Sequence, residues 1–301
     1  MIVAGPIFDR VDAVLRDSHD YTRFRARNMT RDEYANFLDV RRASLIAKGV
    51  PDEDVDYAKR YPADRDDFVR AALARLSANG IIDRDATDPE LMDEARRRAR
   101  RYNHGGRSTY IYPEESDLLA AMTDIRRPGH ILFLGSYYGY WAAATLPALA
   151  LGEGTATLVD PDPDCCRLAE SNLKEEVARG RVKIACTTGE ALLAGSDQRY
   201  DMVVIDAEVP RDHPDPALRG KGVYASLLAA AMPRLADRAL VICHNILLKD
   251  NTGTPVFADI LARNRHELGP FLNLARTRLS GWTEIESTEG VGVGSFRAIA
   301  S

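Results

Sequence analysis

The chain has 301 residues, of which 45% are hydrophobic and 28% are charged, and its formal net charge is −5. This length suffices for a sizeable core in one large domain or two. The negative charge excludes a general attraction to nucleic acid or to an anionic membrane, and the most apolar stretch, residues 141–151, is too short to span a bilayer. The four cysteines form neither a zinc pattern nor a disulfide framework, and no apolar signal segment begins the chain, so we expect a cytoplasmic protein.

The first 105 residues show helical patterns without a strand pattern. Capping residues and helix breakers predict three helices, at residues 30–49, 64–77 and 88–101. The first of them begins with a capping box formed by Thr30 and Glu33. We expect residues 1–105 to be a helical region that covers the active site, shapes the substrate pocket or makes a homodimer. The arginine-rich run at 96–101 is typical of a solvated helix face, with contact to phosphate or RNA as the alternative.

Residues 106–301 form the second predicted domain. A helix at 113–126 leads into a first strand, and from residue 129 onward strands and helices alternate, as in a parallel sheet covered on both faces. The expected strands lie near 130–135, 155–160, 181–186, 200–206 and 238–244, followed by an antiparallel pair at 282–287 and 291–299. The expected helices lie near 138–150, 163–179, 218–235 and 255–268. The predicted fold class is α/β, with a doubly wound, mostly parallel seven-stranded sheet and a helical N-terminal region.

The turn after the first strand of this domain has the features of a cofactor site. Gly135 allows the backbone to approach a ligand, and the following helix offers unpaired N–H groups. The next strand ends in Asp160, whose two acceptor oxygens suit the vicinal hydroxyls of a ribose. A dinucleotide-binding turn has a second glycine where this chain has Tyr137. The turn therefore favours a nucleoside without a diphosphate, such as S-adenosylmethionine, and argues against a dehydrogenase.

Polar residues also follow the other predicted strands. Open parallel sheets bind ligands beyond the carboxyl ends of their strands, and these ends carry Gly135, Ser136, Tyr137, Asp160, Thr188, Gly189, Glu190, Asp206, His244 and Asn245. Taken singly, Asp160 could cap a helix, Asp206 could pair with an arginine, and His244 could be a structural histidine. Together at one edge of one sheet they predict a functional site.

Seven segments in this order carry a resemblance to a known family: PEESDLL, LGSYYGYW, VDPDPD, TTGEAL, YDMVVIDAE, LVICHNILL and EGVGVGSFRAI. From about residue 110 to 299 the chain resembles the class I S-adenosylmethionine-dependent O-methyltransferases of the catechol and caffeoyl-CoA type. The resemblance implies a Rossmann-like methyltransferase fold with S-adenosylmethionine as cofactor. The cofactor-binding residues that it implies are Tyr112, Gly135, Ser136, Tyr137, Gly139, Tyr140, Asp160, Pro161, Gly189, Glu190 and Asp206.

The chain departs from this family at the catalytic positions. The family's divalent cation sits on an aspartate matching Asp206 and on an Asp-Asn pair that falls on His244 and Asn245, and its lysine base falls on Val209. We expect His244 to act as the base, oriented by Asp206, with Asn245 binding the acceptor. The alternative is a metal on Asp206, His244 and Asn245 that lowers the pKa of the acceptor; this set suits manganese, iron or zinc better than magnesium.

The predicted function is S-adenosylmethionine-dependent methylation of a hydroxyl group on a specialised small molecule, of the kind found in secondary metabolism. N-methylation of a small amine or amino acid and methylation of tRNA are alternatives. The non-enzyme alternative is a catalytically idle binding or dimerisation protein with a methyltransferase fold. The expected partners are a small-molecule acceptor and a second copy of the chain, and neither nucleic acid nor membrane is expected.

Overall fold

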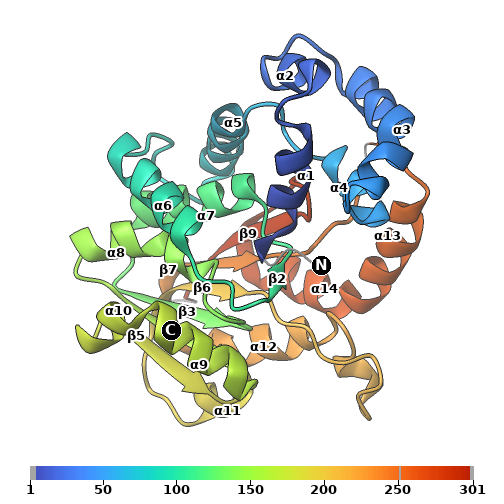
Figure 1. Ribbon diagram of the computed structural model, residues 1–301. Coiled ribbons are helices and arrows are strands. Elements are labelled where there is room, and N and C mark those ends of the chain that lie inside the picture. The colour runs from blue at the N-terminus through green and yellow to red at the C-terminus, as the bar shows by residue number, and fades with distance from the viewer. Residues whose placement is uncertain (1–4, 251, 299–301) are drawn as a thin grey trace.

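The computed structural model describes residues 5–250 and 252–298, and a seven-stranded sheet forms its centre (Figure 1). The strand order is β5-β4-β3-β6-β7-β9-β8. The strands are β3 (His130–Leu134), β4 (Thr155–Asp160), β5 (Val182–Cys186), β6 (Tyr200–Ile205), β7 (Leu235–Cys243), β8 (Leu279–Ile285) and β9 (Val291–Phe296). Neighbouring strands are parallel except that β9 runs antiparallel to both β7 and β8. The predicted doubly wound, mostly parallel sheet is confirmed.

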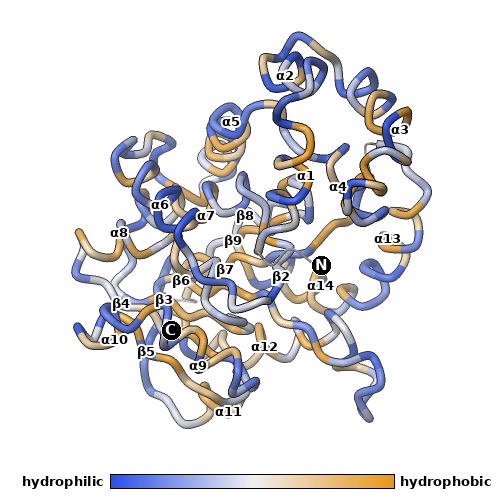
Figure 2. The backbone as a smooth tube through the Cα atoms, in the orientation of Figure 1, coloured by the Kyte–Doolittle hydropathy of each residue, from blue (hydrophilic) through white to orange (hydrophobic). Residues whose placement is uncertain are grey.

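The central strands are apolar because helices cover both faces of the sheet (Figure 2). Successive residues of β3 point to opposite faces, so that Ile131 and Phe133 join one core cluster while Leu132 and Leu134 join the other. The first cluster includes α7 (Pro113–Arg126), and the second includes α12 (Val223–Ala231) and α14 (Gly269–Arg278). The functional edge of the sheet is thus held between two packed layers.

The N-terminal region is helical, as predicted. Its helices are α1 (Ile7–Leu15), α2 (His19–Arg25), α3 (Arg31–Ala47), α4 (Asp52–Ala58), α5 (Arg65–Ala78) and α6 (Pro89–Arg101). Thr30, Asp64 and Asp88 cap α3, α5 and α6 with hydrogen bonds to backbone N–H groups, which confirms these three predicted starts. The expectation of a region without strands is corrected by β1 (Gly5–Pro6), which pairs with β2 (Ser108–Thr109).

The N-terminal helices pack in two groups. Helices α1–α4 form a hydrophobic cluster with Tyr112, Leu247 and Phe257, and they lie beside α13 (Val256–Glu267) (Figure 1). Helices α5 and α6 instead share the core of the sheet with α7. The division at residue 105 stays a prediction, since both groups are joined to the rest of the chain by continuous cores.

Several predicted helices differ in extent. The helix expected at 138–150 is a 3₁₀ turn (Ala142–Thr145) followed by α8 (Leu146–Leu151), because Gly139 has a φ of 81° and Pro147 starts a new helix. The helix expected at 163–179 is divided into α9 (Pro163–Asn172) and α10 (Lys174–Ala178), and the one expected from 218 begins at Val223. Helices α11 (Gly189–Ala194) and α14 were not predicted.

Three further outcomes concern the ends of elements. Strand β7 begins three residues before the expected position, and α13 matches the helix predicted at 255–268. The predicted terminal strand reaches residue 299, which lies outside the described residues.

Within 5–250 and 252–298, none of the helices combines the length and the apolar character needed to cross a membrane.

Candidate functional site

The turn after β3 places backbone atoms without a side chain at the edge of the sheet where the parallel strands end. Gly135 has a φ of 80°, and a Cβ atom at this position would lie 2.5 Å from the Cα of Ala207 and from the carbonyl oxygen of Asp206. Glycine therefore satisfies both the left-handed conformation and the close approach. The N–H groups of Gly135 and Ser136 donate to the Val159 carbonyl at 3.0 and 2.9 Å, which fixes the turn against β4.

Asp160 ends β4 and folds its carboxylate toward this turn. One oxygen accepts the N–H of Tyr137 at 2.8 Å, and the other accepts the N–H of Asp162 at 3.0 Å. Burial raises the pKa of the Asp160 carboxyl, because desolvation outweighs the two hydrogen bonds. Each oxygen keeps a second lone pair, so the carboxylate can still accept ribose hydroxyls.

A cavity of about 40 Å³ opens beside the turn. It is lined by Thr109, Ile111, Phe133, Gly135, Ser136, Tyr137, Tyr140, Trp141, Ala142, Val204 and Asp206. Five of the expected cofactor residues are therefore brought together here, namely Gly135, Ser136, Tyr137, Tyr140 and Asp206. The Tyr137 ring is 38% exposed, so one wall of the cavity faces solvent.

Two of the expected cofactor residues lie away from this cavity. Tyr112 is fully buried and contacts the rings of Tyr57 and Tyr61, with centroids 6.2 and 5.2 Å away. Its ring faces the N-terminal core, so the expectation that Tyr112 contacts the cofactor is not supported. Gly139 packs against Tyr102, whose hydroxyl would lie 2.9 Å from an added Cβ, and so it shapes the turn.

Three further expected cofactor residues, Pro161, Gly189 and Glu190, lie at the same edge of the sheet but do not line the cavity. Gly189 is buried, and a Cβ there would lie 2.6 Å from Leu227. Glu190 accepts a hydrogen bond from Ser226 Oγ at 2.7 Å, and Pro161 is exposed after β4. Their roles toward a cofactor stay predictions.

His244 is fully buried between two carboxylates. Its Nε2 lies 2.8 Å from Glu115 Oε2, and its Nδ1 lies 3.3 Å from Asp206 Oδ1, an ion pair without good hydrogen-bond alignment. Burial alone would lower the pKa of His244, but Glu115 and Asp206 outweigh it and raise this pKa to about 10. Both neighbours therefore favour the protonated imidazolium, and a His244 that is protonated on both ring nitrogens has no lone pair with which to accept a proton from a substrate.

Glu115 connects this pair to two other parts of the molecule. Besides His244, its carboxylate accepts the N–H of Tyr112 at 3.0 Å, the Ser287 hydroxyl at 2.6 Å and the N–H of Glu289 at 2.8 Å. Both oxygens are thus satisfied, as a buried carboxylate requires. The start of α7, the end of β7 and the turn between β8 and β9 are joined at one side chain.

Asp206 is the third member of the buried group with Glu115 and His244, and it is also one of the expected metal ligands. Its Oδ1 accepts the Asn245 amide at 3.0 Å. Burial opposes ionisation, but the charges of His244 and Lys221 and this hydrogen bond lower the pKa of Asp206 overall. Glu115 holds His244 Nε2, while His244 Nδ1 has no hydrogen-bond partner and lies 3.3 Å from Asp206 Oδ1. A carboxylate on one ring nitrogen is also usual for a histidine whose other nitrogen binds a metal, so a cation on Asp206, His244 and Asn245 stays a prediction. Within residues 5–250 and 252–298, no group of three or more acidic, histidine or cysteine side chains is placed to hold a metal ion.

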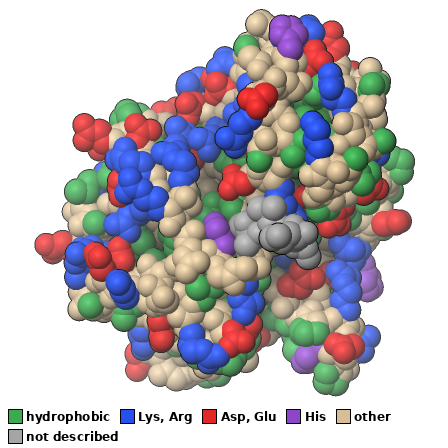
Figure 3. Space-filling view, in the orientation of Figure 1, with side chains coloured by type: hydrophobic (Ala, Val, Ile, Leu, Met, Phe, Trp, Pro, Cys, Tyr) green, Lys and Arg blue, Asp and Glu red, His purple; other side chains and the backbone are tan. Residues whose placement is uncertain are grey.

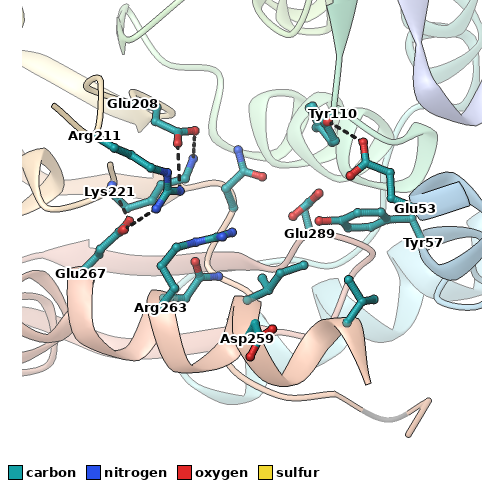
Figure 4. Close-up of a pocket in the computed structure, with 14 residues that line it drawn as sticks. Glu53, Tyr57, Tyr110, Glu208, Arg211, Lys221, Asp259, Arg263, Glu267 and Glu289 are labelled. Carbon is teal, nitrogen blue, oxygen red and sulfur yellow. Dashed lines mark hydrogen bonds and ion pairs between the residues drawn. The ribbon is translucent and has the colours of Figure 1, made fainter. Parts of the chain in front are cut away.

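A larger cavity of about 410 Å³ begins at Asn245 (Figure 4). Its walls come from α4, the loop after β6, α13 and the turn between β8 and β9. It is lined by Glu53, Tyr57, Tyr110, Glu208, Arg211, Lys221, Asn245, Val256, Asp259, Ile260, Arg263, Asn264, Glu267 and Glu289. The helical N-terminal region therefore supplies one wall of this polar cavity.

Lys221 brings an amine into this cavity. The residue is only 8% exposed, and its Nζ lies 3.4 Å from the Tyr224 hydroxyl and 3.9 Å from the Glu208 carboxylate. These contacts are long, and Glu208 itself is half exposed. The ammonium group thus retains donors that can contact a ligand in the cavity.

The loop after β6 determines where this lysine lies. Val209 and Gly220 exchange backbone hydrogen bonds at 3.1 and 2.9 Å, which closes the loop at its base. Glu267 of α13 then accepts the N–H of Lys221 at 2.9 Å and pairs with Arg211 at 3.0 Å. The pairing of Val209 with Gly220 brings Lys221, twelve positions later in the sequence, close to Val209.

Four residues of the site were not predicted from the sequence: Glu115, Lys221, Tyr57 and Glu289. The sequence contains one indication for Glu115, because two adjacent glutamates lie at the start of the helix predicted at 113–126. In the structure every residue of α7 from Glu114 to Asp124 is buried. Lys221 lies in the loop between β6 and α12 and carried no local signal, because the Val209–Gly220 pairing that brings it to the cavity is not visible in the sequence. Tyr57 and Glu289 come from distant parts of the chain and carry no local signal.

The arginine-rich run of α6 forms a basic surface (Figure 3). Arg96 pairs with Asp117 at 2.8 Å, and Arg98 pairs with Glu176 at 2.6 Å. Both carboxylates are buried, so Arg96 and Arg98 anchor α6 to the rest of the protein, while Arg97, Arg100 and Arg101 are exposed as expected for a solvated helix face.

The sheet order, the turn at Gly135 and the acidic end of β4 are those of a methyltransferase fold. Residues 132–246 match the family model described as a methyltransferase domain, and this range includes β3, the cofactor turn and the strand ends with Asp206, His244 and Asn245. This central part of the chain is therefore similar to methyltransferase domains. None of the curated proteins compared with the chain gives a match.

Solved structures support the same fold. An SAH-bound methyltransferase from Podospora anserina, PaMTH1, is 16% identical, with 76% of this chain and 96% of that chain covered and a TM-score of 0.52. A structure provisionally described as an O-methyltransferase from Klebsiella pneumoniae is 19% identical, with 71% and 92% covered and a TM-score of 0.50. At these identities the likeness concerns the fold, which confirms the expected Rossmann-like methyltransferase architecture.

Proposed function

We propose that this protein uses S-adenosylmethionine to methylate a hydroxyl group of a small molecule. The observation that carries this proposal is the position of the two cavities. The one at the Gly135 turn ends at Asp206, and the larger one begins at Asn245, whose amide hydrogen-bonds to Asp206. A methyl donor in the first and an acceptor in the second would meet at this pair. The SAH bound to the Podospora anserina protein supports the choice of cofactor.

The residues around the turn fit the cofactor. Its ribose would be held by Asp160, and its methionine part would run along the bare backbone at Gly135 and Ser136. The enclosed space of about 40 Å³ is smaller than a nucleoside, so we expect the exposed Tyr137 ring to move when the cofactor binds. Bound S-adenosylmethionine supplies an activated methyl group, and the protein supplies alignment and exclusion of water.

Lys221 is the residue that we place against the acceptor oxygen. A free phenol has a pKa of about 10, and a neighbouring ammonium group favours the oxyanion that attacks the methyl group. The released proton would leave to water through the cavity, whose rim is formed by exposed residues such as Arg263. His244 would then hold Asp206 and Asn245 in position rather than act as the base.

Calorimetric titration with S-adenosylmethionine is the direct test. The protein is first treated with a chelator, and the titration is repeated with added Mg²⁺ and Mn²⁺. We expect binding without a cation and a loss of at least tenfold in affinity in Asp160→Ala, with Asp164→Ala, an exposed aspartate after β4, as the matched control. Absence of binding under every condition would favour an idle protein with this fold, and binding only with a cation would restore a metal mechanism.

Two features of the proposal concern the protein as a whole, and two alternative functions remain to be tested. We propose a cytoplasmic location and a homodimer, and size-exclusion chromatography with light scattering tests the second. Retention of tRNA on the protein would favour the RNA-modifying alternative, and methylation of amines but of no hydroxyl compound would favour N-methylation.

A further inference from the structure

Glu289 is a buried carboxylate at one end of the 410 Å³ cavity. The residue is 6% exposed, and no cation of the described residues lies within ion-pair distance of its carboxylate. The Tyr57 hydroxyl points toward it (Figure 4). A carboxylate removed from water without a cationic partner is costly. A ligand with a positive charge would supply the partner that this end of the cavity lacks.

Aromatic rings lie at the same end. Tyr57 and Tyr110 pack edge to face with their ring centroids 6.2 Å apart, and both rings line the cavity. The Tyr110 hydroxyl lies 3.4 Å from Glu53, a second carboxylate at the exposed rim. Two acidic groups and two phenol rings thus converge on one region (Figure 4).

The cations of the cavity lie elsewhere. At the opposite end, Arg211 pairs with Glu267 at 3.0 Å, and Lys221 lies 3.9 Å from Glu208. Arg263 extends from the exposed face of α13 toward the middle of the cavity (Figure 4), one helical turn from the exposed Asp259. These positions leave Glu53 and Glu289 among the acidic groups of the cavity that have no cation of the described residues within ion-pair distance.

We propose that the end of the cavity formed by Glu289, Tyr57, Tyr110 and Glu53 binds an ammonium group of the methyl acceptor. This inference rests on the proposed function and specifies the substrate class as a cationic amine that also carries the hydroxyl to be methylated. Carboxylates supply charge-assisted hydrogen bonds to an ammonium group, and aromatic faces add a cation–π contribution. The hydroxyl end of the molecule would then lie near Lys221 at the other end of the cavity.

The charge on Glu289 is consistent with this assignment. Desolvation, reinforced by the charge of Glu115, raises the pKa of Glu289 to about 8. A bound ammonium group would oppose both effects and favour the ionised carboxylate. Occupation of the cavity by a cation therefore relieves an unfavourable state of the free protein.

A matched pair of phenols tests the inference. Tyramine and 4-ethylphenol have the same ring and chain, but only tyramine carries an ammonium group. Calorimetric binding to the S-adenosylmethionine-treated protein should show tyramine at least tenfold tighter, and the anionic 3-(4-hydroxyphenyl)propionate should be the weakest. Equal affinity for the pair, or no binding of tyramine at millimolar concentration, would overturn the inference.

Two variants locate the ammonium group. Glu289→Gln should reduce the preference for tyramine to less than threefold while keeping the shape of the side chain. Glu53→Gln, at an exposed position that should not affect folding, should reduce it about threefold. Glu175→Gln on exposed α10 is the control and should change nothing. A preference that survives both cavity variants would contradict the assignment.

The same titrations separate failure of this inference from failure of the proposed function. Tyramine selectivity without any binding of S-adenosylmethionine would support the ammonium site and remove the methyltransferase. S-adenosylmethionine binding with methylation of 4-ethylphenol and tyramine at equal efficiency would support the methyltransferase and remove the ammonium site.

Discussion

Two carboxylates and one imidazolium share the interior next to the site. Glu115 and Asp206 both face His244, and four donors satisfy Glu115. Removing one member of such a group leaves a buried charge without its partner, at a cost of about 3–5 kcal/mol. The contribution of His244 is therefore best measured as stability, separately from turnover.

The first prediction follows for His244→Gln. We expect the free energy of unfolding to fall by about 3–5 kcal/mol, because the neutral amide leaves Glu115 and Asp206 uncompensated. Urea denaturation followed by circular dichroism measures this change. His19→Gln, at an exposed position of α2, should change stability by less than about 0.5 kcal/mol. An unchanged midpoint in His244→Gln would contradict the ion-pair assignment.

The pH dependence of stability gives a second prediction. The folded pKa of His244, about 10, exceeds its ordinary value of 6.5, so its contribution is complete below pH 6.5 and is lost as pH rises toward 10. The raised pKa of Glu289, about 8, acts in the same direction. We expect the free energy of unfolding to decrease between pH 7 and 10, and to decrease less in His244→Gln. Urea midpoints that stay level over this range would contradict the sign.

Lys221 gives the third prediction, on turnover. Lys221→Met keeps the length of the side chain but removes the charge that we place beside the acceptor oxygen. We expect a loss of at least tenfold in turnover, in the range found for single groups that stabilise an oxyanion, with unchanged affinity for S-adenosylmethionine. Lys183→Met on the exposed side of β5 is the control. Unchanged turnover would exclude Lys221 from this role.

At the scale of elements, the loop between β6 and α12 shows how a lysine reaches the site from an unexpected position. Its base is closed by backbone pairing of Val209 with Gly220, and Glu267 of α13 holds the next N–H group. Gly220 has a φ of 55°, and a Cβ there would lie 2.3 Å from the Glu267 carboxylate. The position of Lys221 therefore depends on the absence of a side chain at its neighbour.

Gly220→Ala tests this dependence and is the fourth prediction. The added methyl group displaces Glu267 from its contacts with Lys221 and Arg211, so turnover should fall several-fold while S-adenosylmethionine affinity is retained. Gly180→Ala is a matched control, since Gly180 also has a positive φ but open space around it. The control should show only backbone strain, about 1 kcal/mol. Equal turnover in the two variants would argue against the loop as the determinant.

Local signals explain which elements could be predicted. Helices α3, α5 and α6 have capping residues next to clear breakers, and their starts were predicted because a cap acts within one turn. The helix expected at 138–150 was too long because Pro147 and the positive φ of Gly139 outweigh an apolar pattern. Helix α14 follows α13 with a single residue between them, Leu268, so the pattern did not separate them.

The same difference between local and long-range signals determines which parts of the site could be predicted. The cofactor turn and the strand ends were predictable because a parallel sheet brings strand termini to one edge. The contact between His244 and Glu115 was not predictable, because Glu115 lies 129 positions earlier in the chain, and the role of His244 as base stays a prediction. Tyr57 and Glu289 meet only through tertiary packing.

At the scale of the whole molecule, Arg60 joins the N-terminal region to the site. Its guanidinium donates to the carbonyls of Thr288 and Ser287 at 2.9 and 3.2 Å and pairs with Asp250 at 3.2 Å. The turn that it holds also supplies Glu289 and two of the donors to Glu115. The N-terminal helices and the catalytic edge of the sheet are thus linked through one buried side chain.

The fifth prediction concerns Arg60→Met. The apolar side chain leaves two buried carbonyl groups without donors, at about 1–3 kcal/mol for each group, and it loosens the turn that carries Glu289. We expect a lower unfolding temperature and a KM for the acceptor raised several-fold, while S-adenosylmethionine affinity stays unchanged. Arg70→Met, at a position where the side chain is 71% exposed, is the matched control.

Calorimetric unfolding of the same variants shows whether residues 1–105 unfold together with the rest of the chain or as a separate unit. If the N-terminal region depends on Arg60 for its attachment, the wild-type protein should unfold in one transition and Arg60→Met in two, because the helices of α1–α4 then lose their link to the sheet before it melts. A single transition in both proteins would mean that the shared core around Tyr112 and Phe257 suffices to join the two parts. Two transitions already in the wild-type protein would instead make residues 1–105 an independent unit, and the effect of Arg60 on acceptor binding would then have to come from the turn alone.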